Sequence, residues 1–176
     1  MKRHILITGE RGVGKSTLIR RLQQEWGCPV YGFRTVRQAA DETGFHPIYI
    51  QKAACVQEEY RCEEENRIGS CNGRTHAVNK DVFNTLGAQY IEEAQQGGVI
   101  VMDELGFMEA EAEQFKRAVF FALEGDIPVI AAVKARQDIA FLNEVRSHPK
   151  ADLFTVTPQN REELFQKMRM RIRNEG

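Results

Sequence analysis

The sequence predicts a three-layer α/β/α fold with a mainly parallel sheet. Three short apolar runs, at residues 3–8, 99–102 and 127–133, are typical of strands buried on both faces. Each run is followed by a segment with apolar residues at helical spacing. These helical segments are 15–26, 111–123 and 138–146. Strands that alternate with helices predict a parallel sheet with right-handed crossovers.

The remaining elements are predicted around this parallel core. Residues 30–78 are the least regular part of the chain, and we expect them to form antiparallel hairpins inserted between the first and second parallel strands. One weak strand of this insertion is expected near 53–57. A helix is expected over 80–96. A last strand at 153–156 leads to a final helix, whose first position we expect Pro158 to occupy.

The stretch between the first strand and the first helix matches the phosphate-binding loop (Walker A) pattern G-x-x-x-x-G-K-[S/T] at every fixed position. The nucleotide-binding residues expected there are Gly9, Glu10, Arg11, Gly12, Val13, Gly14, Lys15, Ser16 and Thr17. Glycines let the backbone curl so that N–H groups point at an anion, and the helix start adds its positive dipole end. Lys15 is expected to reach the β- and γ-phosphates as a catalytic cation, and Ser16 to bind Mg²⁺. A glycine-rich turn without a ligand would not need the Lys-Ser pair.

Two acidic residues follow the second apolar run. Asp103 and Glu104 lie at the carboxyl end of a predicted strand, where open α/β sheets bind their ligands. We expect Asp103 to be the second Mg²⁺ ligand, in the manner of a Walker B aspartate. Glu104 faces the γ-phosphate only if the strand ends before it, and it could then orient or deprotonate a water molecule. The alternative is a pair of solvated acids.

Charge that develops on a transferred phosphoryl group usually needs a further cation, often an arginine. The candidates are Arg11, Arg34, Arg74 and Arg161. Arg161 is expected to bind nucleotide, because it opens the last helix after a strand, near the expected position of the base. The guanine-reading Asn-Lys-x-Asp motif is absent from the sequence, so the sequence predicts no base preference.

Composition limits the function classes. A chain of 176 residues with 42% hydrophobic and 28% charged residues is expected to form one globular domain over residues 1–176. A net charge of −1 argues against nucleic acid as a partner. No apolar run is long enough to span a membrane, and no signal peptide is recognised, so we expect no membrane association and a cytoplasmic location. The four cysteines match no common zinc module and are expected to be free thiols: Cys28, Cys55, Cys62 and Cys71.

Several short motifs together resemble the small P-loop nucleoside-triphosphatase family, which is known from thermophiles and includes the human cancer-related nucleoside-triphosphatase. The motifs are residues 9–17, Gly32-Phe33-Arg34-Thr35, Gly44-Phe45, Ile68-Gly69 with Val78, residues 101–106, Met108-Glu109 and residues 156–161. The resemblance covers nearly the whole chain. It implies slow, Mg²⁺-dependent hydrolysis of NTP to NDP and phosphate with broad base tolerance. It also places the Mg²⁺-binding and water-activating carboxylates at Asp103 and Glu104.

The chain departs from this family pattern in two places. Phe107 stands where the family usually has lysine, so any charge-stabilising role of that lysine is lost or moved. Residues 60–72 are acidic and contain cysteines in a way that matches nothing in the family. Two alternative functions stay open. One is a kinase that passes the γ-phosphate to a nucleotide or another small molecule, and the other is a nucleotide-dependent switch that serves a partner protein.

Overall fold

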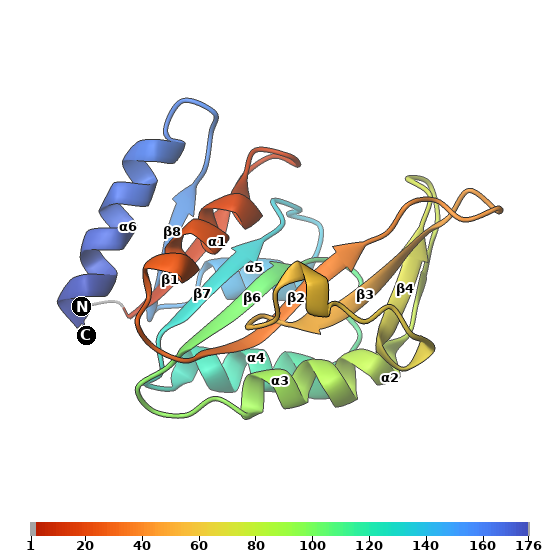
Figure 1. Cartoon of the computed structure of the whole chain (residues 1–176), viewed down its shortest axis with the longest axis horizontal. Coiled ribbons are helices and arrows are strands. Elements are labelled where there is room, and N and C mark those ends of the chain that lie inside the picture. Colours follow the sequence, from red (N-terminus) through yellow and green to blue (C-terminus); the bar gives the residue numbers. More distant parts are fainter. Residues whose placement is uncertain (1–2, 176) are drawn as a thin grey trace.

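The computed structural model describes residues 3–175, and the side chains of residues 3–171. Eight strands form one sheet in the order β5-β4-β3-β2-β6-β7-β1-β8 (Figure 1). In chain order the strands are β1 (His4–Thr8), β2 (Val30–Arg37), β3 (His46–Lys52), β4 (Arg67–Cys71), β5 (His76–Val78), β6 (Val99–Leu105), β7 (Val129–Val133) and β8 (Ala151–Thr155). One sheet suits the expected single domain over 1–176, and that division stays a prediction.

Five neighbouring strands, β2, β6, β7, β1 and β8, run parallel. The apolar runs of β1, β6 and β7 are almost wholly buried, because helices cover both of their faces. The predicted α/β fold with a mainly parallel sheet is therefore confirmed. The carboxyl ends of these strands lie along one edge, where ligands bind in open α/β sheets.

The antiparallel part of the sheet consists of β3, β4 and β5, added in sequence beyond β2. Figure 1 shows this extension projecting past the helices. The sequence analysis assigned residues 30–78 as a whole to the insertion. The structure differs at Val30–Arg37, because β2 pairs in parallel with β6 on one side and antiparallel with β3 on the other. The weak strand expected near 53–57 is a turn followed by a 3₁₀ turn at Gln57–Glu59.

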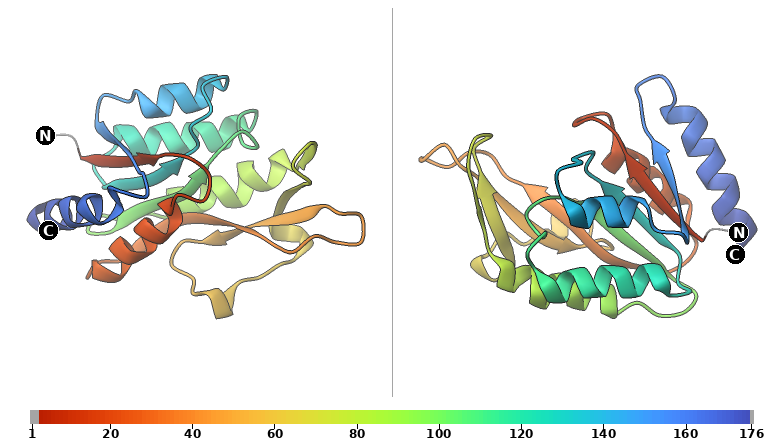
Figure 2. Two further views of the ribbon diagram at one scale, coloured as in Figure 1. Left: turned by 90° about the horizontal axis from the view of Figure 1, so that it is seen from above. Right: turned by 180° about the vertical axis from the view of Figure 1, so that it is seen from behind.

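Helices cover both faces of the sheet, and Figure 2 shows α1 and α6 on one face and α3, α4 and α5 on the other. The helices are α1 (Lys15–Glu25), α2 (Lys80–Val82), α3 (Ala88–Glu92), α4 (Glu113–Glu124), α5 (Ala140–Arg146) and α6 (Arg161–Glu175), with a further 3₁₀ turn at Glu64–Asn66. Two separate cores result. One packs β-strand residues against α1 and α6, and the other packs them against α3, α4 and α5. The three predicted layers are present.

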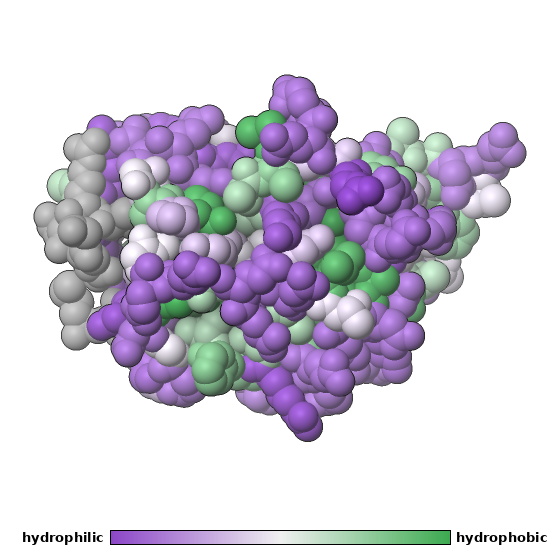
Figure 3. All heavy atoms as spheres, turned by 60° about the horizontal axis from the view of Figure 1, so that its bottom comes forward, coloured by the Kyte–Doolittle hydropathy of each residue, from purple (hydrophilic) through white to green (hydrophobic). Residues whose placement is uncertain are grey.

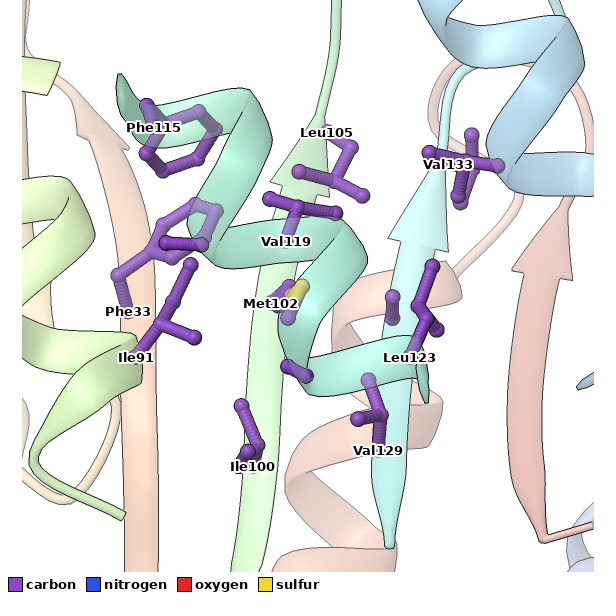
Figure 4. Close-up of a cluster of buried hydrophobic side chains, with 14 of the residues drawn as sticks. Phe33, Ile91, Ile100, Met102, Leu105, Phe115, Val119, Leu123, Val129 and Val133 are labelled. Atoms are coloured by element: carbon purple, nitrogen blue, oxygen red, sulfur yellow. The ribbon is translucent and has the colours of Figure 1, made fainter. Parts of the chain in front are cut away.

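Phe115 is central to the larger core. Its ring contacts Phe33 of β2 edge-on, with 5.3 Å between the ring centroids (Figure 4). It contacts the ring of Phe83 in the same way, also at 5.3 Å. Gly87 lies in the π-helical turn between α2 and α3. A Cβ there would come within 2.7 Å of the Phe115 ring, so only glycine lets this turn approach α4 so closely. The side chain of Asn84 accepts a hydrogen bond from the backbone N–H of Phe115, which satisfies a free donor in the first turn of α4.

The predicted helices at 15–26, 111–123 and 138–146 match α1, α4 and α5 to within two residues at each end, and two other helices differ more. The helix expected over 80–96 is α2 and α3, joined by a π-helical turn at Phe83–Gly87, and it ends at Glu92. The last helix begins at Arg161 rather than at Pro158. Asn160 and Thr157 cap it, since each side chain accepts a hydrogen bond from the backbone N–H of the other. This reciprocal bonding turns the chain before the helix begins.

The side of the molecule at the bottom of Figure 1 carries α3 and α4. Figure 3 shows that its surface is mostly hydrophilic, with apolar side chains in small separate groups. Phe121 of α4 is the most exposed large apolar side chain among the described residues, at 79%. Within the described part of the chain, no helix has the length and apolarity needed to cross a bilayer.

His4 generates a testable pH dependence of stability. It is fully buried in β1, and its Nδ1 accepts a hydrogen bond from the N–H of Val129. Burial lowers the pKa of His4 from 6.5 to about 4, and the charges of His148, Arg3 and Lys150 act in the same direction. Between these pH values the unfolded chain binds a proton at His4 that the folded chain does not, so stability falls as the pH falls.

Lowering the pH through this window should reduce the free energy of unfolding through His4 by about 2–3 kcal/mol. Urea unfolding of the wild type and His4→Asn at a series of pH values measures this loss. Asn keeps an acceptor near the N–H of Val129 but does not titrate, so the pH dependence should flatten. His76→Asn, at an exposed site on β5, is the control and should keep the wild-type slope. An unchanged slope in His4→Asn would contradict the assignment.

Candidate active site

The phosphate-binding loop joins β1 to α1 at the carboxyl edge of the sheet. Gly14, the N-cap of α1, has φ 102°, which is left-handed and suits glycine. A Cβ on Gly9 would lie 2.6 Å from the carbonyl oxygen of Val156, so the loop passes very close to the chain after β8. Val13 is buried in the core with α1, whereas Glu10, Arg11, Gly12, Ser16 and Thr17 are exposed. The loop is anchored from below and open above, where the free N–H groups of α1 can bind an anion.

Lys15 lies inside this loop. Its Nζ donates hydrogen bonds to the carbonyl oxygens of Gly9 and Glu10, both at 3.0 Å, and the residue is only 8% exposed. The ammonium group is also 3.9 Å from Oε2 of Glu104. In this position Lys15 can exchange its two carbonyl partners for phosphate oxygens.

Ser16 and Asp103 meet across the sheet. The Ser16 hydroxyl donates a 2.8 Å hydrogen bond to Oδ1 of Asp103, although 87 positions separate the two residues. The other carboxylate oxygen, Oδ2, is 3.4 Å from Nε of Arg34, and this guanidinium also donates to Oε1 of Gln23. Asp103 and Arg34 are both almost fully buried, at 2% and 4% exposure, so the arginine is the charge partner of the acid.

Glu104 faces the same site, and the prediction that a continuing strand would turn it elsewhere is wrong. Strand β6 continues to Leu105, but its pairing with β7 shifts between Asp103 and Leu105. Asp103 pairs with Ala132 and Leu105 pairs with Val133, so Glu104 is an extra residue on β6 without a partner on β7. Such an irregularity is a β-bulge, and a bulge changes the direction in which the extra side chain points. The Glu104 carboxylate thereby lies between two ammonium groups, 3.9 Å from Lys15 and 3.8 Å from Lys134.

The electrostatics of Glu104 result from opposing effects. Burial raises the pKa of Glu104 above its usual value, and the nearby charges of Lys134 and Lys15 act against that rise. The negative charge of Asp103 adds to the increase. A carboxylate with a raised pKa beside a phosphate-binding loop has the properties of a general base.

The four candidate arginines occupy different places. Arg161, at the start of α6, lies over the loop, since a Cβ on Gly14 would come within 3.1 Å of its Nη1. Arg34 is buried against Asp103. Arg11 is exposed in the loop itself, and Arg74 is exposed in the turn between β4 and β5. The structure thus brings Arg161 to the expected nucleotide site and assigns Arg34 to the support of Asp103.

The sequence analysis gave no role to two residues near Glu104. Glu109 is fully buried and accepts a hydrogen bond from the N–H of Gly106, which holds the loop after β6, and burial raises the pKa of Glu109 to about 7. Lys134 is the first residue after β7. Its position directly after an apolar strand indicates a place at the ligand-binding edge of the sheet. Its proximity to Glu104, however, depends on the order of the strands, which the sequence does not give.

A cavity of about 790 Å³ opens beside the loop, between the segment after β7 and the segment after β8. Its lining includes Gly9 and Val13 of the loop, Gln137 after β7, and Thr157 and Gln159 after β8. This volume lies in the range of small-molecule sites. The cavity lies between the segments at the carboxyl ends of β7 and β8.

The comparisons with known proteins identify the family of this chain. A family model described as NTPase matches residues 4–169. The chain belongs to this NTPase family. A cancer-related nucleoside-triphosphatase homolog from Mus musculus is 30% identical, and the match covers 94% of each chain. The nucleoside-triphosphatase THEP1 of Methanothermobacter thermautotrophicus is 31% identical, covering 92% of this chain and 91% of the relative.

Solved structures of the family share the fold. The solution structure of a human cancer-related nucleoside triphosphatase is 25% identical and superposes with a TM-score of 0.69, with 99% of each chain covered. The crystal structure of THEP1 from Aquifex aeolicus has a TM-score of 0.70 at 24% identity, with 94% of this chain and 96% of that chain covered. The mixed sheet and its helix layers are therefore the family's fold.

Lys15→Ala should abolish nucleotide binding, because the loop loses the cation at its centre. The fall in affinity for ATP should be at least about 100-fold, as expected for the loss of a charge-assisted contact with phosphate. Isothermal titration calorimetry measures it. Lys116→Ala, which removes a lysine paired with Glu113 on α4, is the matched control and should bind like the wild type. Unchanged affinity in Lys15→Ala would contradict the assignment of the loop.

Proposed function

We propose that this chain is a Mg²⁺-dependent nucleoside-triphosphatase that hydrolyses NTP to NDP and inorganic phosphate in the cytoplasm. The observation that carries the proposal is the position of Glu104, beside Asp103 and 3.9 Å from the ammonium group of Lys15. A carboxylate in that place suits activation of water at the end of a triphosphate. The relatives described above are named nucleoside-triphosphatases, and this supports the same activity.

In this proposal the triphosphate lies in the loop formed by residues 9–16. Backbone N–H groups and Lys15 bind the β- and γ-phosphates, and the phosphate oxygens replace the carbonyl groups of Gly9 and Glu10 as partners of Lys15. Arg161 contacts the nucleotide from above Gly14. The base occupies the cavity beside the loop, whose amide side chains, Gln137 and Gln159, can each donate and accept hydrogen bonds. Such a lining suits several bases.

Ser16 and Asp103 would hold the Mg²⁺ ion. They offer a hydroxyl and a carboxylate oxygen 2.8 Å apart, and Mg²⁺ prefers oxygen ligands, taking one or two protein groups together with substrate phosphates and water. When bound, the ion would neutralise charge on the β- and γ-phosphates. Arg34 keeps the Asp103 carboxylate oriented, since it holds the oxygen that Ser16 does not.

Hydrolysis follows from these positions. The oxygen of a water molecule attacks the γ-phosphorus, and the bond from phosphorus to the β–γ bridging oxygen breaks, which leaves NDP and inorganic phosphate. Glu104 orients this water and accepts its proton, which then passes to phosphate or solvent. Lys15 compensates the negative charge that moves to the bridging oxygen.

The kinase alternative requires an acceptor molecule that occupies the place of the attacking water at the γ-phosphate. Phosphate release measured with and without nucleosides and nucleotides as acceptors distinguishes it from hydrolysis. The switch alternative requires a partner protein that binds the NTP and NDP states differently, and a pull-down in each state tests it. Neither alternative is favoured by a contact among the described residues, whereas hydrolysis is favoured by Glu104.

Glu104→Gln should retain NTP binding but lower the rate of phosphate release by at least about 100-fold, because glutamine cannot accept a proton. Steady-state phosphate release and calorimetric affinity together separate these effects. Glu113→Gln, at an exposed site on α4, is the matched control and should hydrolyse normally. Wild-type turnover in Glu104→Gln would place the base elsewhere.

Asp103→Asn should raise the Mg²⁺ concentration needed for half-maximal hydrolysis by about 10-fold or more, since the ion loses a charged oxygen ligand. Removal of the metal with EDTA should stop hydrolysis by the wild type. Asp138→Asn changes an exposed acid paired with Arg136, and it should leave the metal requirement unchanged. A wild-type metal requirement in Asp103→Asn would refute its role as a ligand, provided that thermal unfolding shows a folded variant.

A further inference from the structure

We propose that Lys134 is a second catalytic cation, which contacts the terminal phosphoryl group of bound NTP from the other side of Glu104. The inference rests on the proposed nucleotide site and adds a residue to it. Lys15 is near one oxygen of the Glu104 carboxylate, Oε2, and Lys134 is near the other, Oε1. A phosphoryl group attacked by the water molecule that Glu104 activates would therefore lie between the two lysines.

The backbone position of Lys134 follows from the sheet order. Strand β7 lies between β1, which leads into the phosphate-binding loop, and β6, which ends in Asp103 and Glu104. The first residue after β7 consequently stands between the two halves of the site. Its N–H donates a 2.9 Å hydrogen bond to the carbonyl oxygen of Leu105, and its carbonyl accepts a hydrogen bond from Arg146 of α5.

The side chain of Lys134 is directed by its neighbours. Its stem passes over Gly106, where a Cβ would lie 3.3 Å from Cδ, so glycine leaves room for it. The ammonium group lies 5.1 Å from the centre of the Phe107 ring, a favourable cation–π distance. His76 of β5 contacts the same ring edge-on at 4.7 Å. Lys134 is 40% exposed, so a ligand can reach it.

The charges favour a ligand between the lysines. Among residues 3–171, Glu104 is the one carboxylate within 4 Å of the Lys134 ammonium group, and Lys15 shares it. Two ammonium groups share one carboxylate here, which leaves one positive charge in excess. This excess favours binding of the negatively charged γ-phosphate at the same point.

Of the four arginines considered for this role, Arg34 is paired with Asp103, and Arg161 lies over Gly14 on the other side of the loop. Arg74 is exposed in the turn between β4 and β5, and Arg11 is exposed in the loop.

A cation at the γ-phosphate should change the affinity for NTP and leave the affinity for NDP unchanged. NDP lacks this group, so Lys134 should strengthen binding of NTP but not of NDP, and it should stabilise charge in the transition state. The test compares Lys134→Gln, Lys134→Arg and the control Arg136→Gln with the wild type. Arg136 also lies over Phe107, at 5.3 Å, but its partner is Asp138.

Two measurements are made on each variant. Calorimetry with Mg²⁺ gives the affinities for ADP and for a non-hydrolysable ATP analogue, and phosphate release gives kcat and KM. Lys134→Gln should lower kcat by about 10- to 100-fold and weaken analogue binding by about 10-fold, while ADP affinity stays within about twofold. Lys134→Arg should restore most of both losses, and Arg136→Gln should match the wild type.

The outcomes separate the two proposals. If Lys134→Gln binds the analogue and ADP as the wild type does and keeps its kcat, the inference is wrong. Equal weakening for ADP and the analogue would show a structural role and also refute it. If the wild type releases no phosphate from any NTP, the proposed hydrolase function fails, and a selective loss of analogue affinity in Lys134→Gln would still support the contact.

Discussion

The hydrogen bond from Ser16 to Asp103 is the constraint on which the rest of the structure depends. Its 2.8 Å length requires the start of α1 and the end of β6 to meet, although β7 separates β1 from β6 in the sheet. Parallel strands satisfy this requirement, because all their carboxyl ends lie at one edge. Burial of Asp103 then requires a cationic partner, and β2 supplies Arg34 because Arg34 stands opposite Asp103 in the β2–β6 register.

The charged groups at this edge leave one positive charge in excess. Two carboxylates, Asp103 and Glu104, face three cations, Arg34, Lys15 and Lys134. The ammonium group of Lys15 also donates hydrogen bonds to two carbonyl groups of its own loop, which hold it in place. Binding of an anion exchanges partners in a site that is already arranged, which limits the reorganisation needed for catalysis.

Local sequence predicted the parts of the site that are contiguous in the chain. The phosphate-binding loop is one stretch with one geometry, and Asp103 follows directly from the end of an apolar run. The contacts that join distant strands were not predictable in the same way. Glu104 faces the loop because of a register shift between β6 and β7, and Lys134 is near Glu104 because β7 lies between β1 and β6. Likewise, the dual pairing of β2 depends on which strands become its neighbours.

Phe107 connects the antiparallel extension to the active site. It stands where the resemblance to small P-loop nucleoside-triphosphatases leads one to expect lysine, and a neutral ring there supplies no charge. Lys134, the first residue after β7, lies against this ring, and His76 of β5 contacts the ring from the far edge of the sheet. The aromatic residue thus supports a cation that comes from another strand. One ring therefore contacts both a side chain of β5 and a cation of the proposed active site.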